Sequence, residues 1–350
     1  MIKIKLVKKG GTNYWKKQFP NEKTLIWGNY QFILDPNEKK YDWLIIIDRG
    51  ELIEPITCSA KNTIFIATEP HSITYYGTNF VKQFAYLVTN QNSNSLPHAN
   101  AIRTQPASHW FYEKPYSKII TEKPHKKIKT LSAIATNKTE AHTAHGKRFH
   151  FIKKLSEDLP QTDILFSRSD LSEIFHQFFP NSKFVPTKYD MLDDYKYHLA
   201  IGNQQGNDIF NERISDAFLG YCVPICWGCT NLSDYFPEDS FIEIDINNPE
   251  KSIEKIKQII NDQDDYNKRL KSVIEARRRI MEEYNLPAVI TKIVSDHQPE
   301  KIKTKNKNKI YGRRIIRILN PYDLLGFIKF KIKNFLKTHY NSHFFLHKNQ

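Results

Sequence analysis

Acidic residues follow two short apolar runs in the first third of the sequence. Glu69 comes two residues after the run 63–67 and directly before Pro70. Because such a run predicts a buried strand, the chain leaves the sheet there and places the glutamate at the strand end. A partly desolvated carboxylate in that position is suited to accept a proton near neutral pH. We therefore predict that Glu69 is a general base, with Asp48 and Glu51 after the preceding run as alternatives.

A second group of residues is suited to bind an anion. Asn211 is a good N-cap for a helix predicted to run to about Leu219, so Glu212 and Arg213 occupy its first turn. The backbone amides of a first turn favour negative charge, and arginine adds a planar fork of donors that matches phosphate. We therefore predict that Arg213 is placed to bind a phosphate.

Several common catalytic signatures are absent from the sequence. It contains no GxxxxGK[ST] loop, no GxGxxG, no H-E-x-x-H and no paired CxxC. Cys222, Cys226 and Cys229 lack a fourth ligand and flank a predicted strand, which indicates buried thiols and not a metal cluster. His142 and His145 form an isolated H-x-x-H pair, a weak metal signal. The expected chemistry therefore uses neither a metal nor a cofactor.

Short strands and helices alternate through most of the chain. Strands are predicted over 42–48, 63–67, 84–89, 131–135, 163–166, 197–201, 223–227 and 241–245, and helices over 147–159, 211–219, 249–260 and 266–284. This βαβ spacing predicts two facing, doubly wound, Rossmann-like α/β domains. The polar segment 114–129 is the predicted linker, giving an N-terminal domain at 1–125 and a second domain at 126–298. Ligands of such sheets bind at the carboxyl ends of strands, here in the cleft between the domains.

The positive charge of the chain is concentrated at its end. Of 52 basic and 38 acidic residues, 13 basic ones and a single acid lie in 301–350. In the tail 299–350, Asn320 and Pro321 start a predicted helix with six apolar residues on one face: Leu324, Leu325, Ile328, Ile332, Phe335 and Leu336. With lysines beside that face, 313–337 is predicted to bind an anionic membrane surface. The alternatives are a helix packed on the protein body and, less favoured without a fold motif, nucleic-acid binding.

The segment 195–245 carries the most specific signal. It reads YKYHLAIGNQQGNDIFNERISDAFLGYCVPICWGCTNLSDYFPEDSFIEID. Up to Gly228 it resembles, without gaps, the donor-binding segment of the α1,3/1,4-fucosyltransferases, glycosyltransferase family ten, whose pattern is approximately YKFxLxxENSxxxDYxTEKxxxAFxxGxVPVxxG. More faintly, 132–155 resembles the family's strand, loop and arginine-bearing helix, and 63–76 resembles its strand ending in a glutamate. Together these stretches cover most of 60–290.

The resemblance implies a B-type glycosyltransferase fold and roles for five residues. Glu69 matches the base that takes the proton of the acceptor hydroxyl. Arg148 and Arg213 match the cations that face the donor phosphates. Glu212 matches a glutamate that contacts donor hydroxyls, and Asn203 is expected to orient the donor.

The resemblance also implies an activity. The family pattern predicts an inverting, metal-independent glycosyltransferase that moves L-fucose from GDP-fucose to a bacterial surface glycan such as lipopolysaccharide. Its expected partners are a nucleotide sugar, preferably GDP-linked, and an oligosaccharide or lipid-linked acceptor. The chain departs from the pattern at 202–204, where the family has ENS, and at 208–213, where it has DYxTEK. The alternatives are therefore the same mechanism with another nucleotide sugar, or a non-catalytic glycan- or nucleotide-binding relative.

Length and composition favour a protein of the cytoplasm. The first residues, MIKIKLVKKGG, lack the apolar stretch of a signal peptide, and no apolar run approaches the roughly 20 residues that span a bilayer. Four cysteines in 350 residues are too few for a disulfide framework. We therefore expect a cytoplasmic protein held peripherally on the inner face of the cytoplasmic membrane.

Overall fold

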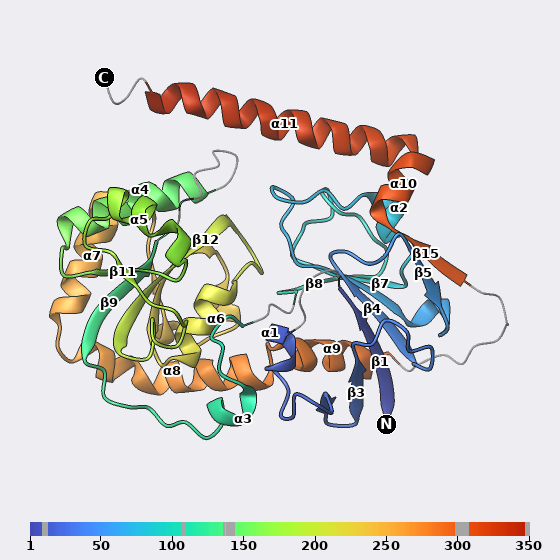
Figure 1. Cartoon of the computed structure of the whole chain (residues 1–350), viewed down its shortest axis with the longest axis horizontal. Coiled ribbons are helices and arrows are strands. Elements are labelled where there is room, and N and C mark those ends of the chain that lie inside the picture. The colour runs from blue at the N-terminus through green and yellow to red at the C-terminus, as the bar shows by residue number, and fades with distance from the viewer. Residues whose placement is uncertain (9–12, 107–109, 136, 138–143, 298–307, 347–350) are drawn as a thin grey trace. The chain divides into compact units, whose positions relative to one another are not determined.

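The chain forms two compact units. The computed structural model describes residues 1–8, 13–106, 110–135, 137, 144–297 and 308–346, with side chains as far as 337 (Figure 1). Unit 1 is formed by Met1–His109, Pro115–Ser117 and Tyr284–Tyr340. Unit 2 consists mainly of Lys118–Glu283, together with Trp110–Lys114.

A seven-stranded sheet is the framework of unit 1. Its strands are, in spatial order, β2 (Ile26–Trp27), β3 (Tyr30–Ile33), β1 (Ile2–Val7), β4 (Trp43–Ile47), β6 (Thr63–Ala67), β7 (Tyr86–Thr89) and β8 (Ala101–Arg103). Only the β2–β3 pair is antiparallel. Every residue of β4 and β6 is buried, as expected for central strands covered on both faces. The strand order reverses between β1 and β4, where such sheets hold their ligands.

Apolar side chains cover both faces of this sheet. On one face, α1 (Asn13–Lys16) and α9 (Leu286–Ser295) pack against β1, β3, β4 and β6. On the other face lie α2 (Thr78–Val81) and residues of β5 (Ile53–Ile56). The 3-10 turn η1 (Ala60–Asn62) leads directly into β6. Eight of the ten residues of α9 are buried, and the N–H of Leu286 donates to Gln18 Oε1 at 2.7 Å. A helix that is apolar on nearly all sides needs such a buried position.

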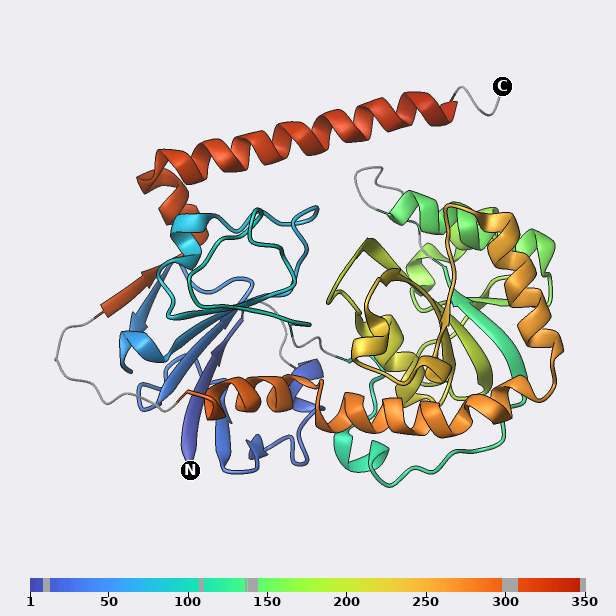
Figure 2. The same cartoon turned by 180° about the vertical axis from the view of Figure 1, so that it is seen from behind.

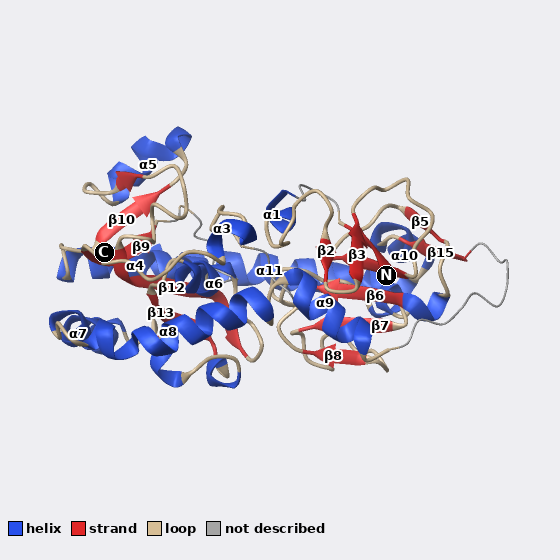
Figure 3. Cartoon of the chain, turned by 90° about the horizontal axis from the view of Figure 1, so that it is seen from below, coloured by secondary structure: helices blue, strands red, loops and turns tan. Residues whose placement is uncertain are grey.

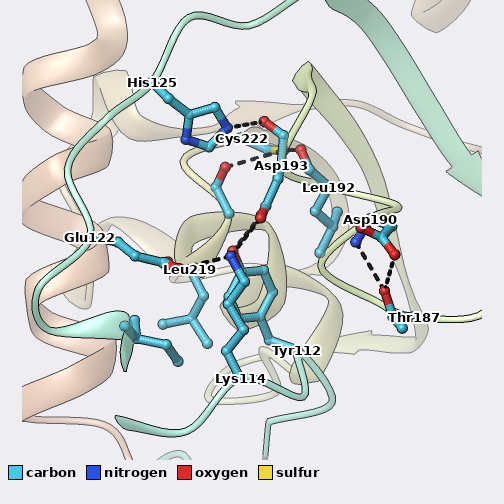
Figure 4. A network of polar contacts seen from close by, with 12 residues as sticks. Tyr112, Lys114, Glu122, His125, Thr187, Asp190, Leu192, Asp193, Leu219 and Cys222 are labelled. Carbon is cyan, nitrogen blue, oxygen red and sulfur yellow. Dashed lines mark hydrogen bonds and ion pairs between the residues drawn. The ribbon is translucent and has the colours of Figure 1, made fainter. Parts of the chain in front are cut away.

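This division differs from the predicted domain boundaries. Helix α9, expected in the second domain, belongs to the core of unit 1. The expected linker 114–129 is largely anchored to unit 2. Lys114 Nζ lies 2.7 Å from the carboxylate of Asp193 and 2.8 Å from that of Glu122, and His125 Nε2 contacts the Asp193 carbonyl at 2.7 Å (Figure 4). The polar residues that resembled a linker therefore hold this segment in place.

Unit 2 is built on a fully parallel sheet. Its strands are, in spatial order, β11 (Lys183–Phe184), β10 (Asp163–Phe166), β9 (Lys129–Ile134), β12 (Tyr195–Gly206), β13 (Val223–Cys229) and β14 (Ile242–Glu243). The three strands that come first in the chain lie on one side and the last three on the other. The order therefore reverses between β9 and β12, which makes this the expected ligand-binding edge.

Helices flank the unit 2 sheet (Figure 3). They are α3 (Tyr116–Ile119), α4 (His145–Asp158), α5 (Ser172–Phe178), α6 (Glu212–Leu219), α7 (Pro249–Asn261) and α8 (Asp265–Glu282), with 3-10 turns η2 (Ser169–Leu171), η3 (Leu232–Asp234) and η4 (Glu238–Ser240). The four helices predicted from periodicity are confirmed as α4, α6, α7 and α8. The alternation of strands and helices in both units confirms the predicted α/β class.

The basic tail packs on unit 1 through one face and exposes another. It comprises β15 (Asn308–Tyr311), antiparallel to β5, then α10 (Arg313–Leu319) and α11 (Pro321–Leu346), which is the long red helix of Figure 2. The buried carboxylate of Asp323 accepts from the N–H groups of Asn79 (3.3 Å) and Phe80 (3.2 Å). Gly326 permits close packing, because a Cβ there would lie 2.1 Å from Tyr75 Oη. The predicted boundary at 299 treated the tail as a separate region. In the structure the tail is instead packed against the rest of unit 1.

The predicted apolar face of the tail helix is the exposed one. Its six members are between 41% and 60% exposed: Leu324, Leu325, Ile328, Ile332, Phe335 and Leu336. They lie on the side of α11 opposite Asp323 and Phe330, which are buried against unit 1. Among the described residues, no helix is both long and apolar enough to cross a membrane.

Candidate active site

Glu69 lies two residues beyond the end of β6, in a loop held on both sides. Its N–H donates to Tyr76 Oη (3.1 Å), and its carbonyl accepts from Gln91 Nε2 (2.8 Å). Gln91 is buried two residues beyond the neighbouring strand β7. The structure therefore places the predicted base at the carboxyl edge of the unit 1 sheet, on a loop with a fixed backbone.

Asp48 organises the same edge. It lies one residue beyond β4 with a left-handed backbone (φ 52°). Its carboxylate accepts from the N–H of Thr68 (2.8 Å), from Thr68 Oγ1 and from the hydroxyl of Tyr76. Burial and the charge of Asp48 raise the pKa of Tyr76 well above its usual value, so this phenol remains a donor. Because both oxygens of Asp48 accept hydrogen bonds, the geometry suits a positioning role and favours Glu69 over Asp48 as the base.

Lys8 belongs to this edge and was not predicted. It follows β1, next to the point where the strand order reverses, and its Nζ lies 4.4 Å from the ring centroid of Trp15. Burial lowers the pKa of Lys8, while the nearby carboxylates of Asp48 and Glu69 raise it. The alternating run IKIKLV was the signal for a strand ending at this lysine.

Arg148 and Asn203 are brought together at the carboxyl edge of the unit 2 sheet. Arg148 lies in the first turn of α4, the helix that follows β9, and is buried. Its Nη1 donates to Asn203 Oδ1 (3.1 Å) and to the carbonyl of Ile201 (3.4 Å), both on β12. Its Nη2 contacts His145 Nδ1 at 3.0 Å, which must be the acceptor because arginine only donates. The pair therefore joins the start of α4, the helix that follows β9, to β12.

Glu212 and Arg213 begin α6, as predicted. Asn211 is the N-cap, and its Oδ1 accepts from the N–H of Arg213 at 3.1 Å. Arg213 Nη1 lies 2.9 Å from Glu212 Oε1, and both side chains are about a quarter exposed, at 23% and 24%. A guanidinium and the open amides of a helix start therefore occupy the loop after β12.

The loop between β12 and α6 is rigid. Asp208 has a left-handed backbone (φ 60°), and its Oδ1 accepts from Asn231 Nδ2 (2.9 Å) and Tyr235 Oη (2.6 Å). Gly228 lets the two strands approach, since a Cβ there would lie 2.9 Å from the carbonyl oxygen of Gln204. Asp208 is one of the motif positions that this chain retains, and here it fixes the backbone that carries Arg213.

Asp216 and Lys188 form a charged environment behind this helix start and were not predicted. Asp216 is 1% exposed, and its Oδ1 accepts from the N–H of Phe111 at 3.0 Å. Burial raises the pKa of Asp216 to about 7, and Lys188 partly opposes this. Burial lowers the pKa of Lys188, near Asp216, Arg213 and Glu212. In the sequence, Asp216 is an ordinary helix position and Lys188 an ordinary loop position. Their burial depends on distant parts of the chain, so the local sequence does not reveal it.

The raised pKa of Asp216 predicts how stability varies with pH. The folded carboxyl holds its proton up to about pH 7, whereas an unperturbed one releases it near 3.8. The unfolding free energy should therefore fall as pH rises through this window, by at most about 4 kcal/mol at about 1.36 kcal/mol per unit. Asp216→Asn keeps the acceptor for Phe111 and should raise the melting temperature at pH 8 but not at pH 4. A variant no more stable than the wild type at pH 8 would contradict this assignment.

Comparisons with known proteins identify the family of the chain. A family model described as glycosyltransferase family 10 (fucosyltransferase), C-terminal part, matches residues 124–306, more than half of the chain. An α-(1,3)-fucosyltransferase of Helicobacter pylori is 33% identical over 76 residues, which cover 21% of this chain and 16% of the relative. Alpha-(1,3)-fucosyltransferase B of Drosophila melanogaster is 20% identical over 239 residues, which cover 67% of this chain and 51% of the relative. The chain thus spans about half, or less, of these relatives.

Solved structures show the same kind of fold. A crystal structure of an α1,3-fucosyltransferase with GDP-fucose is 17% identical and covers 81% of this chain and 92% of its own, with a TM-score of 0.46. An α-glucosyltransferase in complex with UDP and DNA is 12% identical, and the match covers 84% of this chain and 98% of the glucosyltransferase chain, with a TM-score of 0.52. The second likeness confirms the predicted B-type glycosyltransferase fold, and the family match confirms the resemblance in 195–228.

Proposed function

The chain belongs to glycosyltransferase family 10, and we propose that it transfers L-fucose from GDP-fucose to a hydroxyl of a bacterial surface glycan, with inversion and without a metal ion. The observation that carries this proposal is in unit 2. Arg148, at the start of α4, is hydrogen-bonded to Asn203 on β12, and Arg213 lies in the first turn of the capped helix α6 on the same edge.

The donor phosphates are assigned to unit 2. As the glycosidic carbon–oxygen bond to phosphate breaks, its electron pair leaves with GDP and negative charge grows on the diphosphate. Arg213 and the amides at the start of α6 offset that charge without reorganisation, because the cap and the loop before it are fixed. Arg148 is held by Asn203, His145 and the β12 backbone, so its charge is also preorganised.

The base is assigned to unit 1. In an inverting transfer the acceptor oxygen attacks the anomeric carbon from the side opposite GDP, and its proton passes to a carboxylate. Glu69 supplies that carboxylate, and the bonds of its backbone to Tyr76 and Gln91 hold it in position. The positive charge of Lys8 and the negative charge of Asp48 lie near Glu69, and neither side chain takes part in the proton transfer.

A different nucleotide sugar is the second candidate. Gly202 and Gln204 stand where the family has an acid and a serine, and Ile209 and Phe210 make the following loop more apolar. A pocket that lacks polar partners for sugar hydroxyls discriminates weakly between sugars. The loop is rigid and the phosphate-facing cations are kept, so these changes concern the sugar and not the diphosphate.

The transfer itself is tested with the purified full chain, a panel of sugar donors and a lipopolysaccharide-type oligosaccharide acceptor. We expect a product that gains one deoxyhexose from GDP-fucose, with the anomeric configuration opposite to that of the donor. A product formed from a UDP- or CMP-linked sugar, with none from GDP-fucose, would replace fucose and leave the family assignment intact. No product from any donor would favour a non-catalytic relative.

We further propose that the exposed face of α11 rests on an anionic membrane surface. Its apolar side chains are solvent-exposed in the structure, and Lys329, Lys331 and Lys333 lie on its flanks. The opposite face is held to unit 1 by Asp323 and Phe330, so the helix keeps its orientation. Such an anchor would place the enzyme on the inner face of the cytoplasmic membrane, beside a lipid-linked acceptor.

Charged substitutions on this face should abolish vesicle binding. Leu325→Glu combined with Ile332→Glu removes apolar area and repels anionic headgroups, so we expect little co-sedimentation with phosphatidylglycerol vesicles. The melting temperature should stay unchanged, because both side chains are more than half exposed. Ile128→Glu, at a 70% exposed position of unit 2, is the matched control and should bind like the wild type. Equal vesicle binding by all three proteins would refute the anchor.

A further inference from the structure

A cavity of about 330 Å³ lies within unit 1, between the loop after β4 and the tail helices. Its lining carries five cationic side chains and one acidic one: Arg49, Arg313, Arg314, Arg317, Lys331 and Glu51. The volume is at the lower end of the roughly 300–1,000 Å³ that is usual for small-ligand sites. The cavity is distinct from the edge that carries Arg148 and Arg213, which belongs to unit 2.

The cations of this basic pocket outnumber the acidic side chain in its lining by five to one. Within the described residues, none of the five forms an ion pair. Burial lowers the pKa of Arg313 and of Arg317, and the positive charges of neighbouring arginines lower both further. The carboxylates of Asp48 and Asp323 oppose this effect in part. Gathering like charges in a half-buried place is unfavourable unless an anion joins them. The arrangement therefore calls for an anionic ligand.

Arg317 carries a buried donor group that lacks an acceptor in the described part of the chain. Its Nη2 donates to the carbonyl of Tyr75 at 2.8 Å, and its guanidinium carbon lies 3.8 Å from the ring centroid of Phe327. Its Nε is buried and has no hydrogen-bond partner among the residues that the structure describes. A buried donor without an acceptor costs stability, which a ligand oxygen in the cavity would recover.

We infer that this pocket binds a phosphoryl group. Several arginines converge on the cavity, and guanidinium forks match the several oxygens of a phosphate better than the two of a carboxylate. Two sources carry this chemistry: the headgroup of an anionic lipid, and a phosphate on the glycan acceptor. The pocket borders the proposed membrane face, since Lys331 lies one helical turn from Phe327 in the pocket and one turn from the exposed Phe335.

The test uses the full chain and calorimetry with inorganic phosphate and glycerol 1-phosphate. Saturating GDP occupies the proposed donor site, so that phosphate binding there does not contribute. Arg49→Gln combined with Arg314→Gln changes two exposed side chains of the pocket and should weaken binding by about tenfold or more, because charge-assisted hydrogen bonds are the stronger class. Lys39→Gln combined with Lys40→Gln removes the same charge from exposed positions outside the pocket and should bind like the wild type.

Vesicles then distinguish the two sources. If the ligand is a lipid headgroup, glycerol 1-phosphate should displace the wild type from phosphatidylglycerol vesicles, and the pocket variant should bind them more weakly than the Lys39/Lys40 control. If the ligand is an acceptor phosphate, the soluble phosphate should bind but both variants should bind vesicles alike.

The inference would be overturned if the Arg49/Arg314 variant bound phosphate as tightly as the wild type. It would also be overturned if the wild type bound neither phosphate nor vesicles. It does not depend on the donor. A protein that binds glycerol 1-phosphate but ignores GDP would refute the proposed donor and support this pocket.

Discussion

Replacing Glu69 by glutamine is expected to lower the transfer rate by about 10²–10⁴-fold, the usual loss when a positioned base is removed. Glutamine keeps the size of the side chain, and the backbone bonds to Tyr76 and Gln91 do not involve the carboxylate. The affinity for GDP should therefore stay the same. Steady-state kinetics with saturating donor, together with a titration of GDP, measure both quantities.

The neighbouring acids make this experiment decisive. Asp48→Asn should lower activity together with stability, because Asp48 holds Thr68 and Tyr76. Glu51→Gln changes an exposed carboxylate beyond the same strand and should leave the transfer rate within a small factor of the wild type. Full activity of Glu69→Gln, with loss in Glu51→Gln alone, would move the base to Glu51.

Replacing Arg213 by alanine is expected to weaken GDP binding by about 1.5–3 kcal/mol, the range for hydrogen bonds to charged groups. The structure adds a reason for the upper part of that range. Arg213 is paired with Glu212 at 2.9 Å, so its removal takes away this counter-charge of the Glu212 carboxylate at the site assigned to the diphosphate. Calorimetry with GDP measures the loss.

Arg168 is a matched control for this substitution. It lies in unit 2 and is paired with Asp170 at 2.6 Å, but its side chain is 65% exposed. Arg168→Ala should leave GDP affinity unchanged, since an exposed ion pair contributes little. Equal losses in both variants would show that bulk charge, and not the position of Arg213, governs binding.

The short buried strands were predictable because their runs of β-branched residues have few other stable positions. The runs that form β4 and β6 are buried throughout in the structure. Several elements of unit 1 were missed, two of them although their signals were present. The alternating run of β1 was considered only as a targeting sequence, and the apolar stretch Leu286–Ser295 was not connected to the N-terminal sheet. Which sheet a helix covers depends on distant residues, so local pattern could not assign α9.

The candidate site was predicted to the extent that motifs mark it. Asn211 caps α6 as local sequence chemistry indicated, and the resemblance pointed to Arg148 and Asn203, which the structure joins at 3.1 Å. Lys8 and Asp216 escaped prediction, because Lys8 lies outside the motifs and Asp216 stands at a position that the family pattern leaves unspecified. Their perturbed pKa values come from burial and from charges remote in sequence, which only the folded chain brings together.

The central claim is that the cations at the carboxyl edge of unit 2 hold a guanosine diphosphate sugar. Calorimetry of the full chain with GDP, UDP and CMP, in the absence of acceptor and of added metal ions, tests it most directly. The account predicts that GDP binds more tightly than the other two nucleotides and that Arg213→Ala loses most of this affinity. Tight binding of UDP or CMP, with no response to GDP, would contradict the claim.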